Sequence, residues 1–164
     1  RSHADGLPID TAEDDLLNFP QHLDGAPDVI LCMGDTLTHL PDRSSVSEFF
    51  EAVADHLAPG GHFVVTFRDY STPLLGDDRF IPVRSDESRI FTCFLEYGAE
   101  TVDVHDILHE RREGVWAMRV STYRKLRLPP VWVKTELESH GFAVSGEIGL
   151  SGMVQFRATG ASGN

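Results

Sequence analysis

Two short apolar runs on either side of an amphipathic helical pattern constrain the fold of this chain more than any other feature. Residues 28–34 (DVILCMG) and residues 62–67 (HFVVTF) are continuous and contain many β-branched side chains, as strands covered on both faces of a sheet do. Between them, over residues 46–57, apolar side chains recur at the spacing of one helix face. Strand, helix and strand within about 40 residues predict a βαβ unit, which is right-handed with parallel strands in nearly all proteins.

Local signals mark where these elements begin and end. Ser45 and Glu48 have the spacing of a capping box, so we expect the helix to begin there. The Pro-Gly-Gly sequence at residues 59–61 ends it, because glycine adopts the positive φ that a helix exit favours. Upstream, we expect a short strand at residues 7–13 and a short helical segment at residues 16–23.

The second half of the sequence contains longer stretches of β-branched and aromatic residues, separated by tight turns. Antiparallel strands are expected first, then a helix that starts at a Pro-Pro pair, then two closing strands. The expected elements are strands 89–97, 101–112 and 115–123, helix 129–140, and strands 142–148 and 153–159. The chain is therefore predicted to be one α/β domain over residues 1–159 with an antiparallel β elaboration, and the small polar residues 160–164 are expected to form a frayed tail.

The charge balance excludes two classes of partner. Among 164 residues, 26 acidic residues outnumber 14 basic ones and give a net charge of −12. Nonspecific binding to nucleic acid or to an anionic membrane needs a basic surplus, so we expect neither partner. The basic residues between 119 and 127 are interpreted as a strand edge or the rim of a site. No apolar run approaches the roughly 20 residues of a membrane helix, and we expect a cytoplasmic protein.

Cysteine and histidine spacing predicts no metal site. Cys32 and Cys93 each lie in an apolar stretch, which is typical of buried free thiols in a reducing compartment. A disulfide or a metal pair is the less favoured alternative. His105 and His109 are four residues apart on an expected strand and share a face, but a metal site needs a third convergent ligand.

Polar side chains follow both buried strands at their carboxyl ends, where open α/β sheets bind ligands. Asp35 and His39 follow the first strand, and Arg68 and Tyr70 follow the second. Each has a structural alternative: Asp35 caps the next turn, His39 is a core histidine, and Arg68 forms a surface ion pair with Asp69. The position of these residues at the strand ends favours the functional interpretation.

The same segments carry a family resemblance. Residues 28–42 (DVILCMGDTLTHLPD) resemble the fourth-strand motif of class I S-adenosylmethionine-dependent methyltransferases. Residues 46–61 and the strand that ends at residues 67–70 (FRDY) match the next helix and the fifth strand of that family in order and spacing. Within the family the sequence is most similar to the glycine and sarcosine N-methyltransferase group, which residues 119–123 (RVSTY) also resemble. The resemblance runs from about residue 7 to residue 159 and implies the C-terminal portion of a Rossmann-like methyltransferase sheet.

The resemblance implies S-adenosylmethionine as cofactor and assigns residues to it. An acidic side chain before residues 16–17 would accept a hydrogen bond from the adenine amino group. Asp15 is the first choice and Asp14 the second, with Leu16 as an apolar neighbour of the ring. The backbone of Cys32, Met33 and Gly34 would pass beside the methionyl part of the cofactor.

The resemblance also implies the side that holds the methyl acceptor. Asp35 and His39 would line it, Arg68 would bind an acceptor carboxylate, and Tyr70 and Tyr123 would orient the acceptor. Asp35 departs from the family, because a neutral amide occupies its place there. A negative charge at this position disfavours a carboxylate and attracts an amine, so we expect a small-molecule acceptor that is methylated on an amine nitrogen.

Part of the family pattern is missing from the sequence. No Gly-rich cofactor loop and no acidic ribose ligand occur in residues 1–27, and the chain opens on Arg1 rather than Met. We expect a domain that lacks its first two strands and leaves the edge of the strand at 28–34 open. Three explanations remain: upstream residues in a longer protein, strands supplied by another copy through oligomerisation or strand exchange, or a smaller refolded sheet. The alternative function is a non-catalytic remnant or subunit that binds a ligand or partner.

Overall fold

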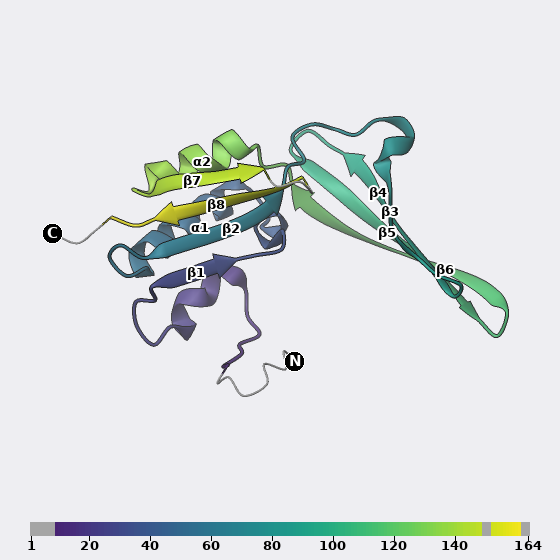
Figure 1. Ribbon diagram of the computed structural model, residues 1–164, viewed down its shortest axis with the longest axis horizontal. Helices are drawn as coiled ribbons and strands as arrows, with labels where there is room; N and C mark the ends of the chain where they lie inside the picture. Colours follow the sequence, from purple (N-terminus) through teal and green to yellow (C-terminus); the bar gives the residue numbers. More distant parts are fainter. Residues whose placement is uncertain (1–8, 149–151, 162–164) are drawn as a thin grey trace.

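The computed structural model describes residues 9–148 and 152–161, which form two four-stranded sheets (Figure 1). In the first sheet, with strand order β1-β2-β8-β7, β1 (Val29–Cys32) lies parallel to β2 (His62–Arg68). β8 (Met153–Thr159) pairs antiparallel with β2, and β7 (Ala143–Ile148) pairs antiparallel with β8. The expected parallel pairing of the two buried runs is confirmed, as are the two closing strands.

Both long helices pack on one face of the first sheet. α1 (Arg43–His56) and α2 (Pro130–Ser139) bury their apolar side chains against side chains of β2 and β8. The Phe49 and Phe63 rings meet edge to face with centroids 5.8 Å apart, and Leu137 of α2 is completely buried in the same core. This core fixes the direction of β1 and β2, and therefore the place where their carboxyl ends lie.

The start of α1 differs from the sequence prediction. Asp42 caps the helix, because its carboxylate accepts a hydrogen bond from the Ser45 N–H at 2.8 Å. The expected capping box of Ser45 and Glu48 is therefore wrong: Ser45 already lies in the first turn, and its hydroxyl donates to Asp42 at 2.9 Å. An aspartate three residues upstream satisfies the free N–H groups of the first turn equally well. The helix ends at His56 and leaves through an extended Leu57, so the glycine exit is wrong: Gly60, with φ +73°, lies in the turn before β2.

The second sheet is fully antiparallel, with one more strand than the sequence analysis predicts. In order it contains β3 (Phe80–Ser85), β4 (Arg89–Tyr97), β5 (Thr101–Arg112) and β6 (Val115–Leu126). β3 follows the short 3₁₀ helix η3 (Gly76–Arg79). All its residues are exposed, so it has no buried face that would give alternating apolar and polar residues. Pro82 and a register shift beside it are compatible with this edge position, where a missing N–H costs no ladder hydrogen bond.

The described N-terminal region leaves one edge of the first sheet open. The short helix η1 (Leu16–His22) is confirmed, as a 3₁₀ helix packed against α1. Residues 9–13 form no strand, so the expected strand at 7–13 is wrong for these five; residues 7 and 8 lie outside the described residues. Within the described part of the chain β1 pairs only with β2, and Val29 and Leu31 are 51% and 62% exposed.

One arginine joins the two sheets. Arg127, just after β6, donates from Nε to the carbonyl of Tyr70 at 2.9 Å and from Nη2 to that of Ser71 at 2.8 Å. Its Nη1 donates to the carbonyls of Gly98 and Ala99, in the turn between β4 and β5. The guanidinium therefore fixes the loop after β2 against the second sheet.

The C-terminal residues that the sequence assigns to a frayed tail begin with two hydrogen-bonded positions. The Gly160 N–H donates to the Gly61 carbonyl, and the Gly60 N–H donates to the Ala161 carbonyl, both at 3.0 Å. Residues 162–164 lie outside the described residues. Among the described helices, none has the length and apolar character needed to cross a membrane.

Candidate active site

A cavity of about 430 Å³ lies where the carboxyl end of β2 meets the second sheet. Arg68 and Tyr70 reach it from the end of β2, and Cys93, Tyr123 and Lys125 reach it from β4 and β6. Three of the predicted site residues, Arg68, Tyr70 and Tyr123, therefore line one cavity although they come from different sheets.

Asp35 connects the ends of β1 and β2. It is 3% exposed and adopts a left-handed conformation with φ 75°, directly before the 3₁₀ helix η2 (Thr36–His39). One carboxylate oxygen accepts from the Arg68 N–H at 2.8 Å and from the Thr38 hydroxyl at 3.0 Å. The other accepts from the Tyr70 hydroxyl at 3.2 Å. The contact with Thr38 is the one expected if Asp35 only capped the next turn. Two other partners of its carboxylate, Arg68 and Tyr70, line the cavity.

Lys125 is the residue that the sequence analysis missed. It is 8% exposed on β6, and its Nζ forms an ion pair with the second carboxylate oxygen of Asp35. The expectation that Asp35 offers a free charge to an acceptor amine is therefore corrected: a lysine of the chain already neutralises it. A buried carboxylate requires a counter-ion, and Lys125 lies on the same strand face as Tyr123, two residues away. A lysine on the strand face of Tyr123, able to neutralise a buried aspartate, was therefore the feature of the sequence that could have indicated this ion pair.

The two tyrosines surround this ion pair. The Lys125 Nζ lies 5.6 Å from the Tyr123 ring centroid and 5.9 Å from that of Tyr70, within the range of cation–π attraction. Burial and the adjacent Asp35 carboxylate raise the pKa of Tyr70 far above its usual value, and burial also raises the pKa of Tyr123. Both phenols therefore stay protonated at neutral pH, and Tyr70 acts as a donor to Asp35.

His39 lies at the rim of the site rather than in the core. Its side chain is exposed, so the core-histidine alternative is wrong. The imidazole stacks on the Tyr123 ring with centroids 5.5 Å apart and planes inclined by 29°. Partial burial lowers the pKa of His39, and the nearby Lys125 charge lowers it further. His39 is therefore neutral at physiological pH and is able to accept a proton.

Arg68 lines the cavity, and its backbone N–H donates to Asp35. The alternative of an ion pair with Asp69 is wrong: Asp69 instead accepts from the Ser71 N–H at 2.8 Å, and the ion pairs of the described residues include none between Arg68 and Asp69. Arg68 is exposed, so its guanidinium is accessible to a ligand.

The backbone of Cys32, Met33 and Gly34 at the end of β1 is open on one side, and we call it the ledge. The Gly34 N–H donates to the Thr66 hydroxyl at 2.8 Å, which holds the chain at φ +75°. A side chain at Gly34 would meet no atom within 4 Å, and Met33 is 48% exposed. Cys32 is a buried free thiol, and its pKa is raised by burial to about 11, so it is no nucleophile at neutral pH. The ledge leaves room for the methionyl part of a cofactor.

The three residues expected at the adenine form a separate cluster at the start of η1. Asp15 caps this helix by accepting from the Leu17 N–H at 2.9 Å. Asp14 accepts from Asn18 at 2.9 Å and from His22 at 2.8 Å, and these hydrogen bonds lower its pKa to about 2. Leu16 packs partly buried against the core. The carboxylate of Asp15 is thus engaged locally, and the hydrogen bonds found in the described part of the chain include none from these three residues to Asp35.

Comparison with solved structures identifies the fold. No protein-family model matches the chain, and no curated protein matches its sequence. An S-adenosylmethionine-dependent methyltransferase from Clostridium acetobutylicum ATCC 824 aligns with a TM-score of 0.77 at 15% identity, over 96% of this chain and 67% of that one. CalS10, an amino pentose methyltransferase from Micromonospora echinaspora, aligns with a TM-score of 0.73 at 16% identity, over 89% and 62%.

The sugar N-methyltransferase KedS8 from Streptoalloteichus sp ATCC 53650 gives a TM-score of 0.72 at 15% identity, over 91% of this chain and 61% of that one. The fold is therefore that of S-adenosylmethionine-dependent methyltransferases, as the motifs predict. The chain spans about three fifths of the length of CalS10 and KedS8. Membership of the glycine and sarcosine group stays a prediction.

Proposed function

We propose that this protein forms the acceptor-binding part of a methyltransferase that uses S-adenosylmethionine to methylate an amine nitrogen of a small molecule. The observation that carries the proposal is the cavity at the end of β2, which Tyr70 and Lys125 line while both bind the buried carboxylate of Asp35. The methyltransferase fold supports it, as do the amino pentose and sugar N-methyltransferases among the similar structures.

In this proposal the ledge at the end of β1 holds the cofactor. Met33 and Gly34 would pass beside its methionyl part, where the open space at Gly34 fits such a group. Cys32, directly before them, contributes backbone only, since its side chain is buried in the core. Asp15, or Asp14 as the second choice, would accept a hydrogen bond from the adenine amino group, with Leu16 beside the ring; Asp15 also caps the helix that carries them. The cofactor supplies an electrophilic methyl group.

The acceptor would lie in the cavity. Arg68 would bind an anionic oxygen of the acceptor through its fork of N–H donors. Tyr123 and Tyr70 would orient it, while Asp35 fixes Tyr70 and the Arg68 backbone in place. Methyl transfer needs an unprotonated amine held in line with the methyl group. His39, neutral and stacked on Tyr123, would accept the proton of an acceptor ammonium at a ring nitrogen.

A second candidate function rests on the open edge of β1. Val29 and Leu31 are exposed, and among the described residues no strand pairs with this edge. Both features fit a subunit that becomes complete when another polypeptide adds a parallel strand. In that case the chain binds a partner and performs no chemistry by itself.

Transfer of labelled methyl groups distinguishes the two candidates. The protein is incubated with S-adenosylmethionine carrying a labelled methyl group and a panel of small amines, amino sugars and amino acids. The proposal predicts label in at least one amine, and loss of this signal in Tyr123→Ala. The matched control is Trp116→Ala, since Trp116 lies on the same strand as Tyr123 but on the opposite face of the sheet. No label in any amine would contradict the proposal and favour the partner-binding subunit.

A further inference from the structure

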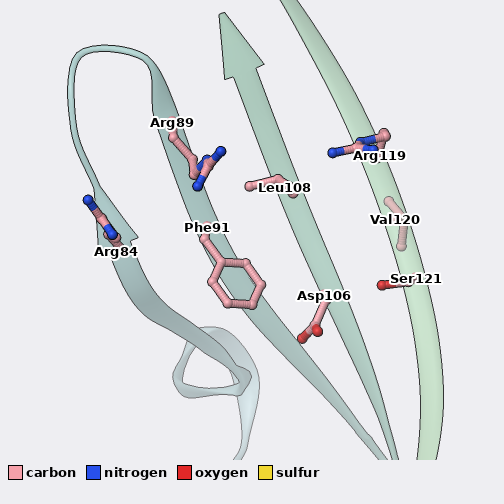
Figure 2. Close-up of a pocket in the computed structure, with 8 residues that line it drawn as sticks. All are labelled: Arg84, Arg89, Phe91, Asp106, Leu108, Arg119, Val120 and Ser121. Carbon is pink, nitrogen blue, oxygen red and sulfur yellow. The ribbon is translucent and has the colours of Figure 1, made fainter. Parts of the chain in front are cut away.

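A second cavity, of about 630 Å³, is lined by residues from all four strands of the second sheet (Figure 2). Arg84 of β3, Arg89 of β4 and Arg119 of β6 surround it, and Phe91 and Leu108 form an apolar floor. We call this cavity the arginine pocket. Three arginines around one cavity stand out in a chain that carries a net charge of −12.

The arginine pocket and the candidate active site lie on the same face of the second sheet. Residues paired directly across strands share a face, and so do residues two apart along a strand. The cross-strand row Leu95–Val104–Tyr123 lines the candidate site. The row Phe91–Leu108–Arg119 lines the arginine pocket.

One row separates the two: Cys93 and Asp106 are directly opposed on β4 and β5, and the Cys93 thiol donates to Asp106 at 3.1 Å. From Tyr123 to Arg119 is four residues of strand, or about 13 Å. A single elongated ligand is able to reach both places.

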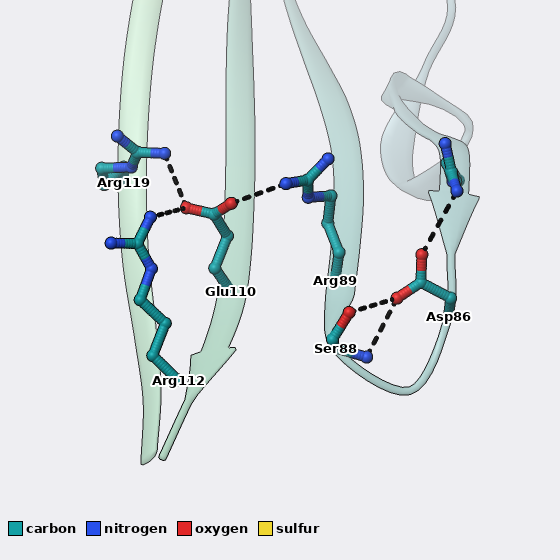
Figure 3. A network of polar contacts seen from close by, with 7 residues as sticks. Asp86, Ser88, Arg89, Glu110, Arg112 and Arg119 are labelled. Atoms are coloured by element: carbon teal, nitrogen blue, oxygen red, sulfur yellow. Dashed lines mark hydrogen bonds and ion pairs between the residues drawn. The ribbon is translucent and has the colours of Figure 1, made fainter. Parts of the chain in front are cut away.

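A shared carboxylate holds the arginines in place (Figure 3). Glu110 accepts from Arg89 at 2.9 Å, from Arg119 at 2.7 Å and from Arg112 at 3.4 Å. These arginines lower the pKa of Glu110, so it stays ionised at neutral pH. Each of the three guanidinium groups contacts Glu110 through a single Nη2 and keeps further N–H donors for a ligand.

Positive charge exceeds negative charge in this network. Arg84 pairs with Asp86 at 3.5 Å, so four arginines share two carboxylates in this network, and Asp106 adds a third carboxylate to the lining of the pocket. Guanidinium groups bind phosphate and carboxylate in bidentate fashion, and the apolar floor suits the carbon skeleton next to such a group. The local charge and geometry therefore fit an oxyanion that reaches the pocket from the candidate site.

We propose that the arginine pocket binds an anionic group, a phosphate or a carboxylate, at the remote end of the methyl acceptor whose amine lies beside Tyr123. This inference rests on the proposed function for its acceptor, while the anion site itself needs no cofactor. It makes the acceptor an elongated molecule with an amine at one end and an anion about 13 Å away.

Calorimetric titration with inorganic pyrophosphate tests the anion site. The purified protein is expected to bind it saturably, and the double variant Arg89→Gln, Arg119→Gln to bind at least tenfold more weakly. The matched control is Arg157→Gln, an exposed arginine on β8 of the first sheet, which should bind like the unaltered protein. No saturable binding, or an equal loss in the control, would overturn the inference. Because no cofactor takes part, failure here is distinguishable from failure of the proposed methyl transfer.

Two aminoalkyl phosphates test whether the anion belongs to the acceptor. 8-Aminooctyl phosphate is long enough to span both cavities, whereas 2-aminoethyl phosphate is not. The long probe should bind at least tenfold more tightly, because its second contact is intramolecular, and it should shift the NMR signals of Tyr123 as well as those of Arg119. Equal affinity of the two probes, with signals shifted only around Arg119, would show an independent anion site and contradict the link to the acceptor.

Discussion

The carboxylate of Asp35 and the ammonium of Lys125 form a buried ion pair between residues that are 90 positions apart in the sequence. Their side chains are only 5% and 10% exposed, and they join the end of β1 to the last strand of the second sheet. The pair thereby couples the part of the fold that would hold a cofactor to the part that would hold an acceptor.

Removing Lys125 alone should destabilise the protein strongly. Lys125→Met leaves Asp35 buried without a counter-ion, and breaking such a pair from one side costs about 3–5 kcal/mol. The double variant Asp35→Asn, Lys125→Met should recover part of that loss, since neither charge remains. Urea unfolding of the two single variants and the double variant gives the coupling free energy. Strictly additive effects would mean that the two side chains do not interact.

Replacing Arg68 should weaken binding of the acceptor far more than binding of the cofactor. Hydrogen bonds to a charged group contribute about 1.5–3 kcal/mol, so Arg68→Ala should raise the acceptor KM by about 10- to 100-fold. The cofactor KM should change little. Arg124→Ala is the control, because Arg124 is exposed and paired with Asp103 on the other face of the second sheet. An unchanged acceptor KM in Arg68→Ala would remove Arg68 from the site.

His39 should titrate below the usual range of histidine. Partial burial and the Lys125 charge lower its pKa, so the neutral imidazole persists to a lower pH than in an exposed peptide. Because the folded-state pKa lies below the unfolded one, protonation favours unfolding, and the contribution of His39 to stability is lost as the pH falls through these values. NMR titration of the ring protons measures the pKa directly. Lys125→Met should raise it, and a pKa above 6.5 in the unaltered protein would contradict the assignment.

The sequence predicts the fold well where hydrophobic periodicity determines it. The two buried runs, the helix between them and the closing strands follow from that pattern alone. β3 escapes detection because all its residues are exposed and Pro82 interrupts it. The capping box failed because Asp42 satisfies the same N–H groups one turn earlier.

The candidate site is only partly predictable for a different reason. Asp35, Arg68 and Tyr70 are found by their position after parallel strands, which is a local property of the chain. Lys125 becomes part of the site through the docking of the second sheet, and no local pattern encodes that contact. Asp15 shows that one sequence context fits two roles: it caps a helix in the structure, and its role as an adenine ligand stays a prediction.

Cofactor binding at the end of β1 tests the central claim most directly. S-Adenosylhomocysteine is titrated calorimetrically into the protein, into Gly34→Ala and into Gly114→Ala. Both glycines have positive φ, +75° and +83°, and open space around the added methyl group, so the backbone strain is comparable. Because residues 1–27 contain no Gly-rich cofactor loop, we predict weak binding. Gly34→Ala should reduce it at least tenfold further and Gly114→Ala should leave it unchanged, because only the first methyl group would meet the cofactor. Equal affinity in all three proteins, or no binding to any, would contradict a cofactor site at this ledge.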